Sequence, residues 1–503
     1  YLTLGFDNAI YLLSGKYGIL DYEIIYFLFN EVNVLEKNDK NIKIFQEFLF
    51  SNKKDFNKNL YRKLFGVVTP IALQYLMSSL VSASDAFMLG FLEQDALSAS
   101  SLAGQVAFVF SLFFGAFVFG CTVLAAQYWG KGDQKTTEEV LAITMRYSLL
   151  VGLIFTLATA IIPEVIMRFF TKNEVLIVAG GKYLRMASLS YVLTGFSQAY
   201  YGIMKVCDRA KLSSVIGSLA VVINIILNAM LIFGVGIFPR MEIEGAALAT
   251  VIARVFECIC VLVVVGKKMC PPLRVKMMFY TKNKELNKDY WRYTIPLLIN
   301  QIGWGGGVTM YSVIMGHLGS DATAANSIAS IVRSMIASLC WGIASGVGII
   351  LGGMLGRNEF EDAKKAGGSF VRFSIWIGIG SGLVILALTP LVLQVITLEP
   401  QAQHYLKYMM FMAAYYIIGN SLNSTIITGI FPSGGDTKFG MCCDVITLWC
   451  VVVPLGMLAA FVWKLPVLAV AAILTLDEFV KIPAVYWHYM KFKWVKNITI
   501  DEK

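Results

Sequence analysis

The stretch GFLEQDALSASSLA at residues 90–103 recurs as GHLGSDATAANSIA at residues 316–329, with Gly, Leu, Asp, Ala, Ala, Ser and Ala identical in register. The same offset of 226 residues aligns Pro70 with Pro296, Gly120 with Gly346 and Gly130 with Gly356. Chance does not hold one register from Pro70 to Gly130. The chain is therefore predicted to consist of two homologous halves.

The composition is that of a membrane protein. The 503 residues are 57% hydrophobic and 15% charged, whereas soluble domains are about 45–50% apolar and about 25% charged. A helix needs about 20 apolar residues to cross a hydrocarbon core of about 30 Å. Such runs predict an all-α membrane protein of twelve transmembrane helices in two pseudo-symmetric six-helix bundles, at residues 64–91, 98–128, 138–168, 175–205, 211–235, 243–267, 290–316, 322–355, 361–396, 401–430, 438–463 and 465–491.

Basic residues in the loops predict the orientation, because cytoplasmic loops accumulate Lys and Arg. With the N-terminus inside, the cytoplasmic face collects the basic segment 267–292 together with Lys131, Lys135, Lys205, Arg209, Lys211, Arg357, Lys364, Lys365 and Lys438. We therefore expect a multi-pass protein of a bacterial plasma (inner) membrane with both termini cytoplasmic. The formal net charge of +9 follows from this topology, so we expect no nucleic-acid partner.

The repeat divides the chain into five expected parts. These are a cytoplasmic N-terminal extension of unknown role at 1–60, a first six-helix lobe at 61–266, a basic cytoplasmic linker at 267–287, a second lobe at 288–495 and a cytoplasmic tail at 496–503. Paired repeats of this kind build transporters whose substrate site lies at the repeat interface and whose access alternates between the two sides.

Asp85, within VSASDAFMLG at residues 81–90, is the charge that this architecture must accommodate. An aspartate facing hydrocarbon costs about 2.5 to 3.5 kcal/mol on insertion scales. Helical spacing gives Asp85 a partly polar face that includes Gln74, Met77, Ser78, Val81 and Ser82. We expect this face to meet a wet interior. The repeat counterpart of Asp85 is Tyr311, so the first half is expected to carry a charge site that the second half lacks.

Four more polar residues are expected in the outer half of the first lobe, at the depth of Asp85: Tyr183, Asn224, Asn228 and Thr250. Asn224 and Asn228 share a helix face because they are spaced i, i+4. One carboxylate with several neutral oxygens would hold a proton or a small cation such as Na⁺. The alternative is that the asparagines only form hydrogen bonds between helices, as membrane Asn residues do.

At this point the sequence resembles the multidrug and toxic compound extrusion (MATE) family, in its bacterial DinF-like branch. The resemblance covers about residues 61–500 and rests on SASDAFMLG at 82–90, NIILNAMLIFG at 224–234, EGAALAT at 244–250 and GGDTKFGMCCDVITLWCVVVPLG at 434–456. It implies twelve helices in two bundles and export of small organic, often cationic, compounds driven by inward H⁺ or Na⁺. We expect a monomer in the lipid bilayer, with no cofactor beyond the coupling ion.

The resemblance also implies roles for particular residues. Asp85 matches the family's coupling carboxylate, supported by Asn224, Asn228 and Thr250, while Tyr183 is a looser match. Pro70 matches a proline at which helix 1 bends, and proline permits a kink because it removes a helix hydrogen bond. Some members have a second acid where Asn228 stands, and the acidic pair that other branches carry in the second half lacks a counterpart. The choice between H⁺ and Na⁺ therefore stays open.

Substrate contacts are expected from Gln74, Met77 and Ser78 on the Asp85 face and from Gln301 and Trp304 on helix 290–316, although packing in the core or against lipid explains these residues equally well. Structural ion pairs are expected among Asp444, Asp477, Glu478 and Lys481. The nine cysteines are expected to be buried free thiols. The GxxxG pairs Gly303/Gly307 and Gly342/Gly346 are expected to allow close helix packing.

Two other functions were compared with transport. An enzyme is not expected, because the three histidines are far apart, no HExxH is present, and SGGD at 433–436 lacks the GxGD spacing of intramembrane aspartyl proteases. The closer alternative is a flippase for lipid-linked precursors. Such flippases often have fourteen spans and a strongly cationic cavity, whereas twelve spans and mostly neutral cavity candidates are found here.

Overall fold

The computed structural model describes residues 54–90, 94–235, 238–272, 274, 277–278, 283–396 and 398–499. The side chains of residues 54–59, 82, 83, 85–87, 89, 90 and 94–97 are outside this description. The predicted extension up to residue 53, parts of the basic linker, residues 500–503 and the side chain of Asp85 thus lie outside the described residues. All contacts given below fall within one compact unit, Asn59–Lys503.

The described residues form helices and no strand. The first half contains α4 (Lys54–Gly90), α5 (Gln94–Lys131), α6 (Gln134–Ile161), α7 (Pro163–Phe170), α8 (Glu174–Val206), α9 (Ala210–Phe233) and α10 (Glu242–Gly266). The second half contains α12 (Lys284–His317), α13 (Ser320–Gly356), α14 (Phe360–Val395), α15 (Pro400–Asn423), η1 (Ser424–Ile430), α16 (Phe431–Ser433), α17 (Thr437–Ile446), η2 (Thr447–Val452), α18 (Val453–Met457), η3 (Leu458–Val462), α19 (Val467–Leu474) and α20 (Asp477–Met490).

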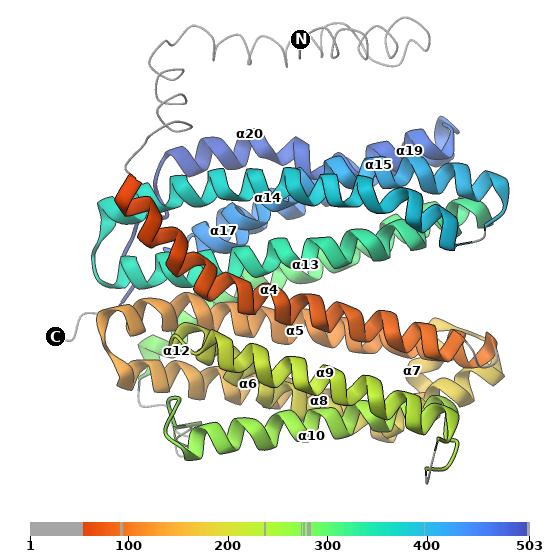
Figure 1. Ribbon diagram of the computed structural model, residues 1–503, viewed down its shortest axis with the longest axis horizontal. Coiled ribbons are helices and arrows are strands. Elements are labelled where there is room, and N and C mark those ends of the chain that lie inside the picture. Colours follow the sequence, from red (N-terminus) through yellow and green to blue (C-terminus); the bar gives the residue numbers. More distant parts are fainter. Residues whose placement is uncertain are drawn as a thin grey trace, which may run out of the picture. The chain divides into compact units, whose positions relative to one another are not determined.

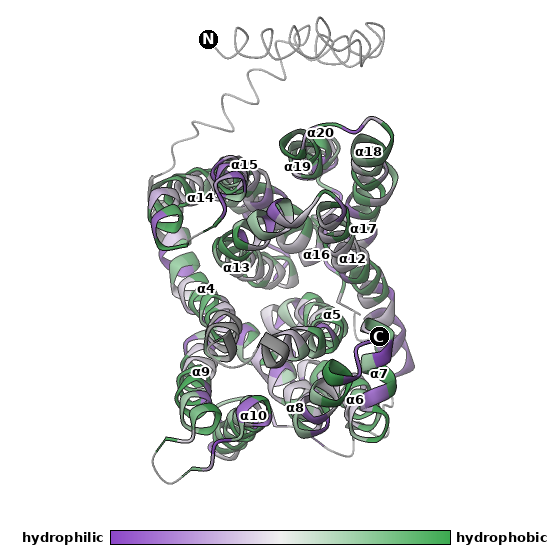
Figure 2. Ribbon diagram, turned by 90° about the vertical axis from the view of Figure 1, so that its right-hand side faces the viewer, coloured by the Kyte–Doolittle hydropathy of each residue, from purple (hydrophilic) through white to green (hydrophobic). Residues whose placement is uncertain are grey.

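Across the described ranges these elements make twelve passes, because several passes consist of more than one helical segment. One pass is formed by α6 and α7, one by the segments from α15 to α16, one by those from α17 to η3, and the last by α19 and α20. The helices lie side by side in Figure 1. Viewed along the helices, α8, α9 and α10 form part of one bundle, and α13, α14 and α15 part of another (Figure 2). By length and composition alone, eight described spans are apolar enough to cross a membrane. The predicted all-α fold of two six-helix bundles is confirmed.

Three predicted helix boundaries are wrong for local reasons. The helix expected at 138–168 ends at Ile161, because Ile162 leaves the helical region (φ −126°, ψ 41°) and Pro163 starts α7. Proline is favoured at a first helical position, where its missing N–H needs no partner. The last pass is broken between Leu474 and Asp477. Helix α4 begins at Lys54 rather than near residue 64, because the polar stretch before the apolar run is helical as well.

The first helix of each half packs against the bundle of the other half. On α4, the Phe65 ring lies 5.5 Å from the Phe373 ring of α14, edge to face. On α12, the Trp291 ring lies 4.6 Å from the Tyr147 ring of α6, again edge to face. The 226-residue offset converts one pair into the other, since Phe65 aligns with Trp291 and Tyr147 with Phe373. The two crossings are therefore equivalent under the repeat, and they hold the bundles together.

Glycines allow these crossings to come close. A Cβ added at Gly346 of α13 would lie 2.5 Å from Val68 Cγ2 on α4, and one at its counterpart Gly120 on α5 would lie 2.1 Å from Thr294 Oγ1 on α12. The neighbouring side chains would have to move to admit even a methyl group. The predicted GxxxG packing is confirmed, since added Cβ atoms would lie within 3.0 Å of a neighbouring helix at Gly303, Gly307, Gly342 and Gly346.

The C-terminal ends of α5 and α13 meet beside the α5–α6 and α13–α14 loops. A Cβ at Gly130 would lie 2.3 Å from the Gly353 carbonyl oxygen, and a Cβ at Gly356 would lie 2.0 Å from the Gln127 carbonyl oxygen. These two contacts also interchange under the 226-residue offset. The two bundles are thus packed backbone to backbone at the end of the molecule where these basic loops lie.

Candidate functional site

Three of the predicted site residues form a hydrogen-bonded chain inside the first bundle. Asn228 Nδ2 donates to Asn224 Oδ1 at 3.2 Å, and Asn224 Nδ2 donates to Thr250 Oγ1 at 3.4 Å. The Thr250 hydroxyl in turn donates to the Ala246 carbonyl oxygen at 3.1 Å. Both asparagines are buried, Asn228 completely. The chain links α9 to α10 and fixes the orientation of both amides inside the bundle.

Helix α4 reaches this region near its C-terminal end. Met88 and Tyr183 pack against a small buried cluster formed by Ile232 of α9 and Ala246 of α10. Ala246 is also the residue that accepts the Thr250 hydroxyl hydrogen bond. Met88 lies less than one helical turn beyond Asp85, so the backbone of Asp85 is within one turn of this cluster. The side chain of Asp85 is outside the described residues, and its role stays a prediction.

The predicted substrate contacts divide between two places. Gln74 is buried beside α9, with its Nε2 3.1 Å from the position of a Cβ at Gly217. Ser78 is exposed and donates to the Gln74 carbonyl oxygen at 3.0 Å, and Met77 is half-buried. The contacts of Gln74 are therefore made with α9 and within α4.

Gln301 and Trp304 lie instead where α12 packs against α5. Gln301 Nε2 is 3.2 Å from the position of a Cβ at Gly115 of α5. The Trp304 ring is 6.5 Å from Phe108 of α5 and 5.2 Å from Trp341 of α13. This pair therefore belongs to the contact between the bundles.

The second bundle contains a buried charged network that joins three passes. Lys481 Nζ of α20 lies 2.8 Å from Asp444 Oδ1 of α17 and 3.1 Å from Glu478 Oε2. The amides of Asn420 and Asn423 on α15 donate to the two Glu478 carboxylate oxygens at 3.0 and 2.8 Å. The predicted structural ion pairs of Lys481 with Asp444 and Glu478 are confirmed. Lys481 pairs with both carboxylates, and the two amides satisfy further Glu478 oxygen lone pairs, which offsets part of the cost of burying these charges.

The second half has Tyr311 at the position equivalent to Asp85, but it carries buried acids at another position. Asp477 and Glu478 are buried at the N-terminus of α20, where the helix dipole stabilises a negative charge. Tyr311, the repeat counterpart of Asp85, lies within electrostatic range of Asp477. The break in the last pass places these acids at a helix N-terminus, and the pair Asp477–Glu478 within the otherwise apolar start of residues 465–491 marks its position in the sequence.

A second buried network was missed by the sequence reasoning. Glu257 of α10 lies 2.7 Å from Arg254 Nη1 and accepts a hydrogen bond from the Ser197 hydroxyl of α8 at 2.9 Å. Only 2% of Glu257 is exposed. Its signal was available in the sequence, because Arg254 and Glu257 are opposite charges at i, i+3 inside an apolar span.

Lys205 was counted as a loop charge, and the structure corrects this. It lies in the last turn of α8 and is 7% exposed, with Nζ 5.1 Å from the centre of the Tyr75 ring of α4. Among the described side chains no acid forms an ion pair with it. It therefore contributes a buried cation at the α4–α8 contact instead of a solvated cytoplasmic charge.

All nine cysteines are free thiols, and five are buried. The expectation that they are all buried is wrong, because Cys442 and Cys450 are exposed on the helix surface.

In the part of the chain that the structure describes, no group of His, Cys, Asp or Glu side chains has an arrangement that could hold a metal ion.

Comparison with known proteins gives a consistent result. The family model MatE matches residues 70–230 and 296–458, two segments whose starting points are 226 residues apart. The probable multidrug resistance protein YoeA of Bacillus subtilis (strain 168) is 24% identical over 461 residues, covering 90% of this chain and 98% of that protein.

Two crystal structures of the Vibrio cholerae MATE transporter VcmN have the same fold. An aspartate-to-asparagine mutant has a TM-score of 0.79 at 14% identity, covering 88% of this chain and 100% of that chain. The bent form has a TM-score of 0.77 at 14% identity, covering 87% and 98%.

Proposed function

The chain belongs to the MatE family of multidrug and toxic compound extrusion transporters, and from this premise we propose that it exports small organic, mostly cationic, compounds in exchange for inward H⁺ or Na⁺. It is a multi-pass membrane transporter and not an enzyme. The proposed coupling residue is Asp85, with Asn224, Asn228 and Thr250 as supporting groups and Tyr183 beside them. Pro70 is the proposed hinge of α4.

The buried Asn228–Asn224–Thr250 chain is the observation that carries this proposal. Amide and hydroxyl oxygens are the neutral ligands that complete a site for a small cation around one carboxylate. The amide N–H and hydroxyl O–H groups of the same side chains can donate hydrogen bonds to a carboxylate and so influence its protonation. Their position beside the end of α4 supports a role for the carboxylate that this helix carries.

The proposed cycle is a switch in the charge of Asp85. Burial favours the neutral form of a carboxylate, so a proton or Na⁺ arriving from outside neutralises the group. A neutral Asp85 no longer attracts a cationic substrate, and α4 repacks around Pro70 as the substrate leaves. Competition of ion and substrate for one carboxylate provides the differential binding that a coupled change of state requires.

The contacts between the bundles support an arrangement that is closed on the side of the basic loops. The backbone contacts at Gly130 and Gly356 lie beside these loops, whereas Asn224 lies in the later half of α9, toward the other side. With the basic loops and both termini placed in the cytoplasm, this conformation receives the coupling ion from outside the cell. We place the protein in a bacterial inner membrane, as a monomer with no nucleic-acid partner, and with no cofactor beyond that ion.

The test is efflux of a cationic dye from proteoliposomes under separately imposed proton and sodium gradients. An antiporter drives dye against its concentration gradient only when an ion gradient of the opposite direction is imposed. The ion whose gradient drives dye movement is the coupling ion. Dye movement that is independent of both gradients would contradict antiport. The flippase alternative, which the family assignment does not favour, instead predicts gradient-dependent movement of a lipid-linked sugar with no dye transport.

A further inference from the structure

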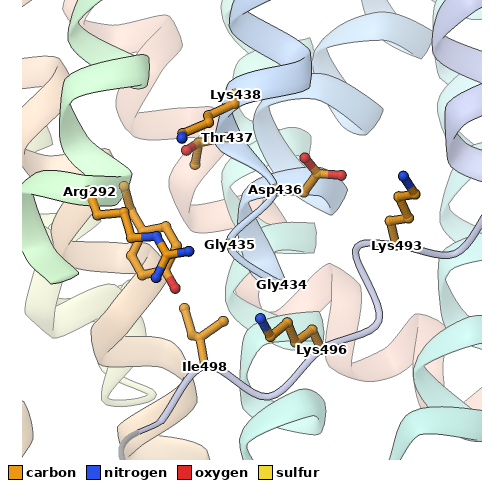
Figure 3. A pocket seen from close by; sticks show the side chains of 10 residues that line it. Arg292, Gly434, Gly435, Asp436, Thr437, Lys438, Lys493, Lys496 and Ile498 are labelled. Atoms are coloured by element: carbon orange, nitrogen blue, oxygen red, sulfur yellow. The ribbon is translucent and has the colours of Figure 1, made fainter.

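A basic cavity lies away from the proposed coupling site, where α12, the α16–α17 turn and the C-terminal segment meet (Figure 3). Its volume is about 250 Å³, which is room for about eight water molecules at about 30 Å³ each. Arg292, Lys438, Lys493 and Lys496 line it. None of these four cations forms an ion pair with an acid among the described residues.

Among the described residues that line the cavity, the one acid is Asp436, and it is already engaged. Asp436 Oδ2 accepts a hydrogen bond from His488 Nε2 at 2.6 Å. Although Asp436 occupies the N-cap position of α17, its side chain makes no capping hydrogen bond there. The cavity therefore keeps an excess of positive charge, and the first N–H groups of α17 are left without the carboxylate that commonly satisfies them.

The turn before α17 packs closely against its own chain, since a Cβ at Gly434 would meet the Trp494 carbonyl oxygen and one at Gly435 would lie 2.8 Å from the Tyr293 ring. Gly434 and Gly435 form the turn before α17, and Gly435 has φ +79°, a conformation that side chains with a Cβ rarely adopt. Figure 3 shows Arg292 and Lys496 on either side of this turn. Uncapped N–H groups at a helix N-terminus favour an anion, and nearby guanidinium and ammonium groups strengthen this preference.

An unsatisfied hydroxyl gives an independent indication of a ligand. Thr437, the first residue of α17, lines the cavity and is 3% exposed, and its Oγ1 has no hydrogen-bond partner among the described residues. A buried hydroxyl without a partner costs free energy, and an oxyanion in the cavity would accept its hydrogen bond. We infer that the cavity is a binding site for a phosphate group, carried either by an anionic lipid headgroup or by a soluble phosphate compound.

The location of the site links it to the contact between the bundles. Gln127 Nε2 of α5 donates hydrogen bonds to the carbonyl oxygens of Ser433 and Lys496 at 2.6 and 3.0 Å, and Gln127 Oε1 accepts a hydrogen bond from the Ile498 backbone N–H at 2.8 Å. Gln127 also takes part in the close contact with Gly356. A bound phosphate would connect α12, α17 and the C-terminal segment directly beside this contact, and would favour the packed arrangement of the bundles.

The test uses the full chain in two arms. In detergent, binding of inorganic phosphate is followed by the rise in Tm at constant ionic strength, with chloride as the reference anion. In nanodiscs of phosphatidylcholine with or without phosphatidylglycerol, retained lipid is counted by native mass spectrometry. Arg292→Gln/Lys496→Gln is compared with Lys407→Gln/Lys491→Gln, which removes two positive charges outside the cavity, and Thr437→Val removes the hydroxyl alone.

We expect wild type and the control pair to bind in at least one arm, and the cavity pair to bind at least tenfold more weakly, with Thr437→Val in between. A rise in Tm with inorganic phosphate would show that a soluble phosphate compound can bind the cavity. Retention of phosphatidylglycerol without a rise in Tm would show that the ligand is a lipid headgroup. Equal binding by the cavity pair and the control pair, or no binding in either arm, overturns the inference.

Discussion

Gly352 packs against its own repeat counterpart, Ala126: a Cβ added at Gly352 would lie 2.7 Å from the Ala126 Cβ. The two residues are 226 positions apart, so the axis that relates the two halves passes between them. The contacts at Gly130 and Gly356 lie on either side of this point. Small residues at these positions let two helix backbones meet, which is the usual means of close helix association in membranes.

Enlarging Gly356 is expected to open this contact. In Gly356→Val the added Cβ would lie 2.0 Å from the Gln127 carbonyl oxygen, and such overpacking costs about 1–3 kcal/mol. We predict a lower Tm and a faster reaction with a water-soluble thiol reagent of a cysteine introduced at Ala126, which is buried in this contact. Gly380→Val is the control, because a Cβ at Gly380 meets nothing within 4 Å; equal behaviour of the two variants would show that the contact does not hold the bundles closed.

Removing the cation of the second-bundle network is expected to be strongly destabilising. Lys481→Met leaves Asp444 and Glu478 buried without their shared partner, and breaking a buried pair in this way costs about 3–5 kcal/mol. The measurement is the free energy of unfolding in detergent. Adding Asp444→Asn and Glu478→Gln to Lys481→Met should recover most of the loss, whereas an unrepaired loss would assign the effect to packing of the lysine stem.

The buried Lys205 side chain is expected to lower the free energy of unfolding. Lys205→Met removes a buried cation that has no ion pair among the described residues, and it keeps an apolar chain of similar length beside Tyr75. The free energy of unfolding should rise by about 1–3 kcal/mol, the usual range for an uncompensated buried polar group. Lys211→Met, at an exposed position, should change it by less than about 0.5 kcal/mol. A loss of stability in Lys205→Met would show that the cation stabilises the α4–α8 contact.

The sequence was sufficient for the twelve spans and for the repeat, because apolar run length and a fixed register are properties of the linear chain. The proximity of Asn224, Asn228 and Thr250 could also be predicted, since the two asparagines share a helix face and Thr250 is expected at the same depth. The sequence could not show that the last pass breaks before Asp477, or that Asn420 turns toward Glu478. The contact between Asn420 and Glu478 depends on helices that are distant in sequence, and the charges at Asp477, Glu478 and Lys481 are compatible with an unbroken helix as well as with a broken one.

Substitution of Asn224 and Asn228 distinguishes a role in ion coupling from a role in helix packing. Hydrogen bonds between membrane helices contribute about 0.6 kcal/mol on average, so Asn224→Ala and Asn228→Ala should each lower the free energy of unfolding by about that amount. If the chain serves coupling, gradient-driven efflux should fall at least tenfold in the same variants. Efflux that stays at the wild-type level with the same small loss of stability would assign the asparagines to packing alone.

The most direct measurement is gradient-driven dye efflux by Asp85→Asn in proteoliposomes, compared with wild type and with Asp362→Asn, which alters an exposed acid in the first turn of α14 that pairs with Lys365. We predict that Asp85→Asn falls to the rate of protein-free vesicles while its Tm stays near the wild-type value, and that Asp362→Asn transports normally. Asp85→Asn efflux at the wild-type rate, with the same dependence on the ion gradient, would contradict the assignment of coupling to the first bundle.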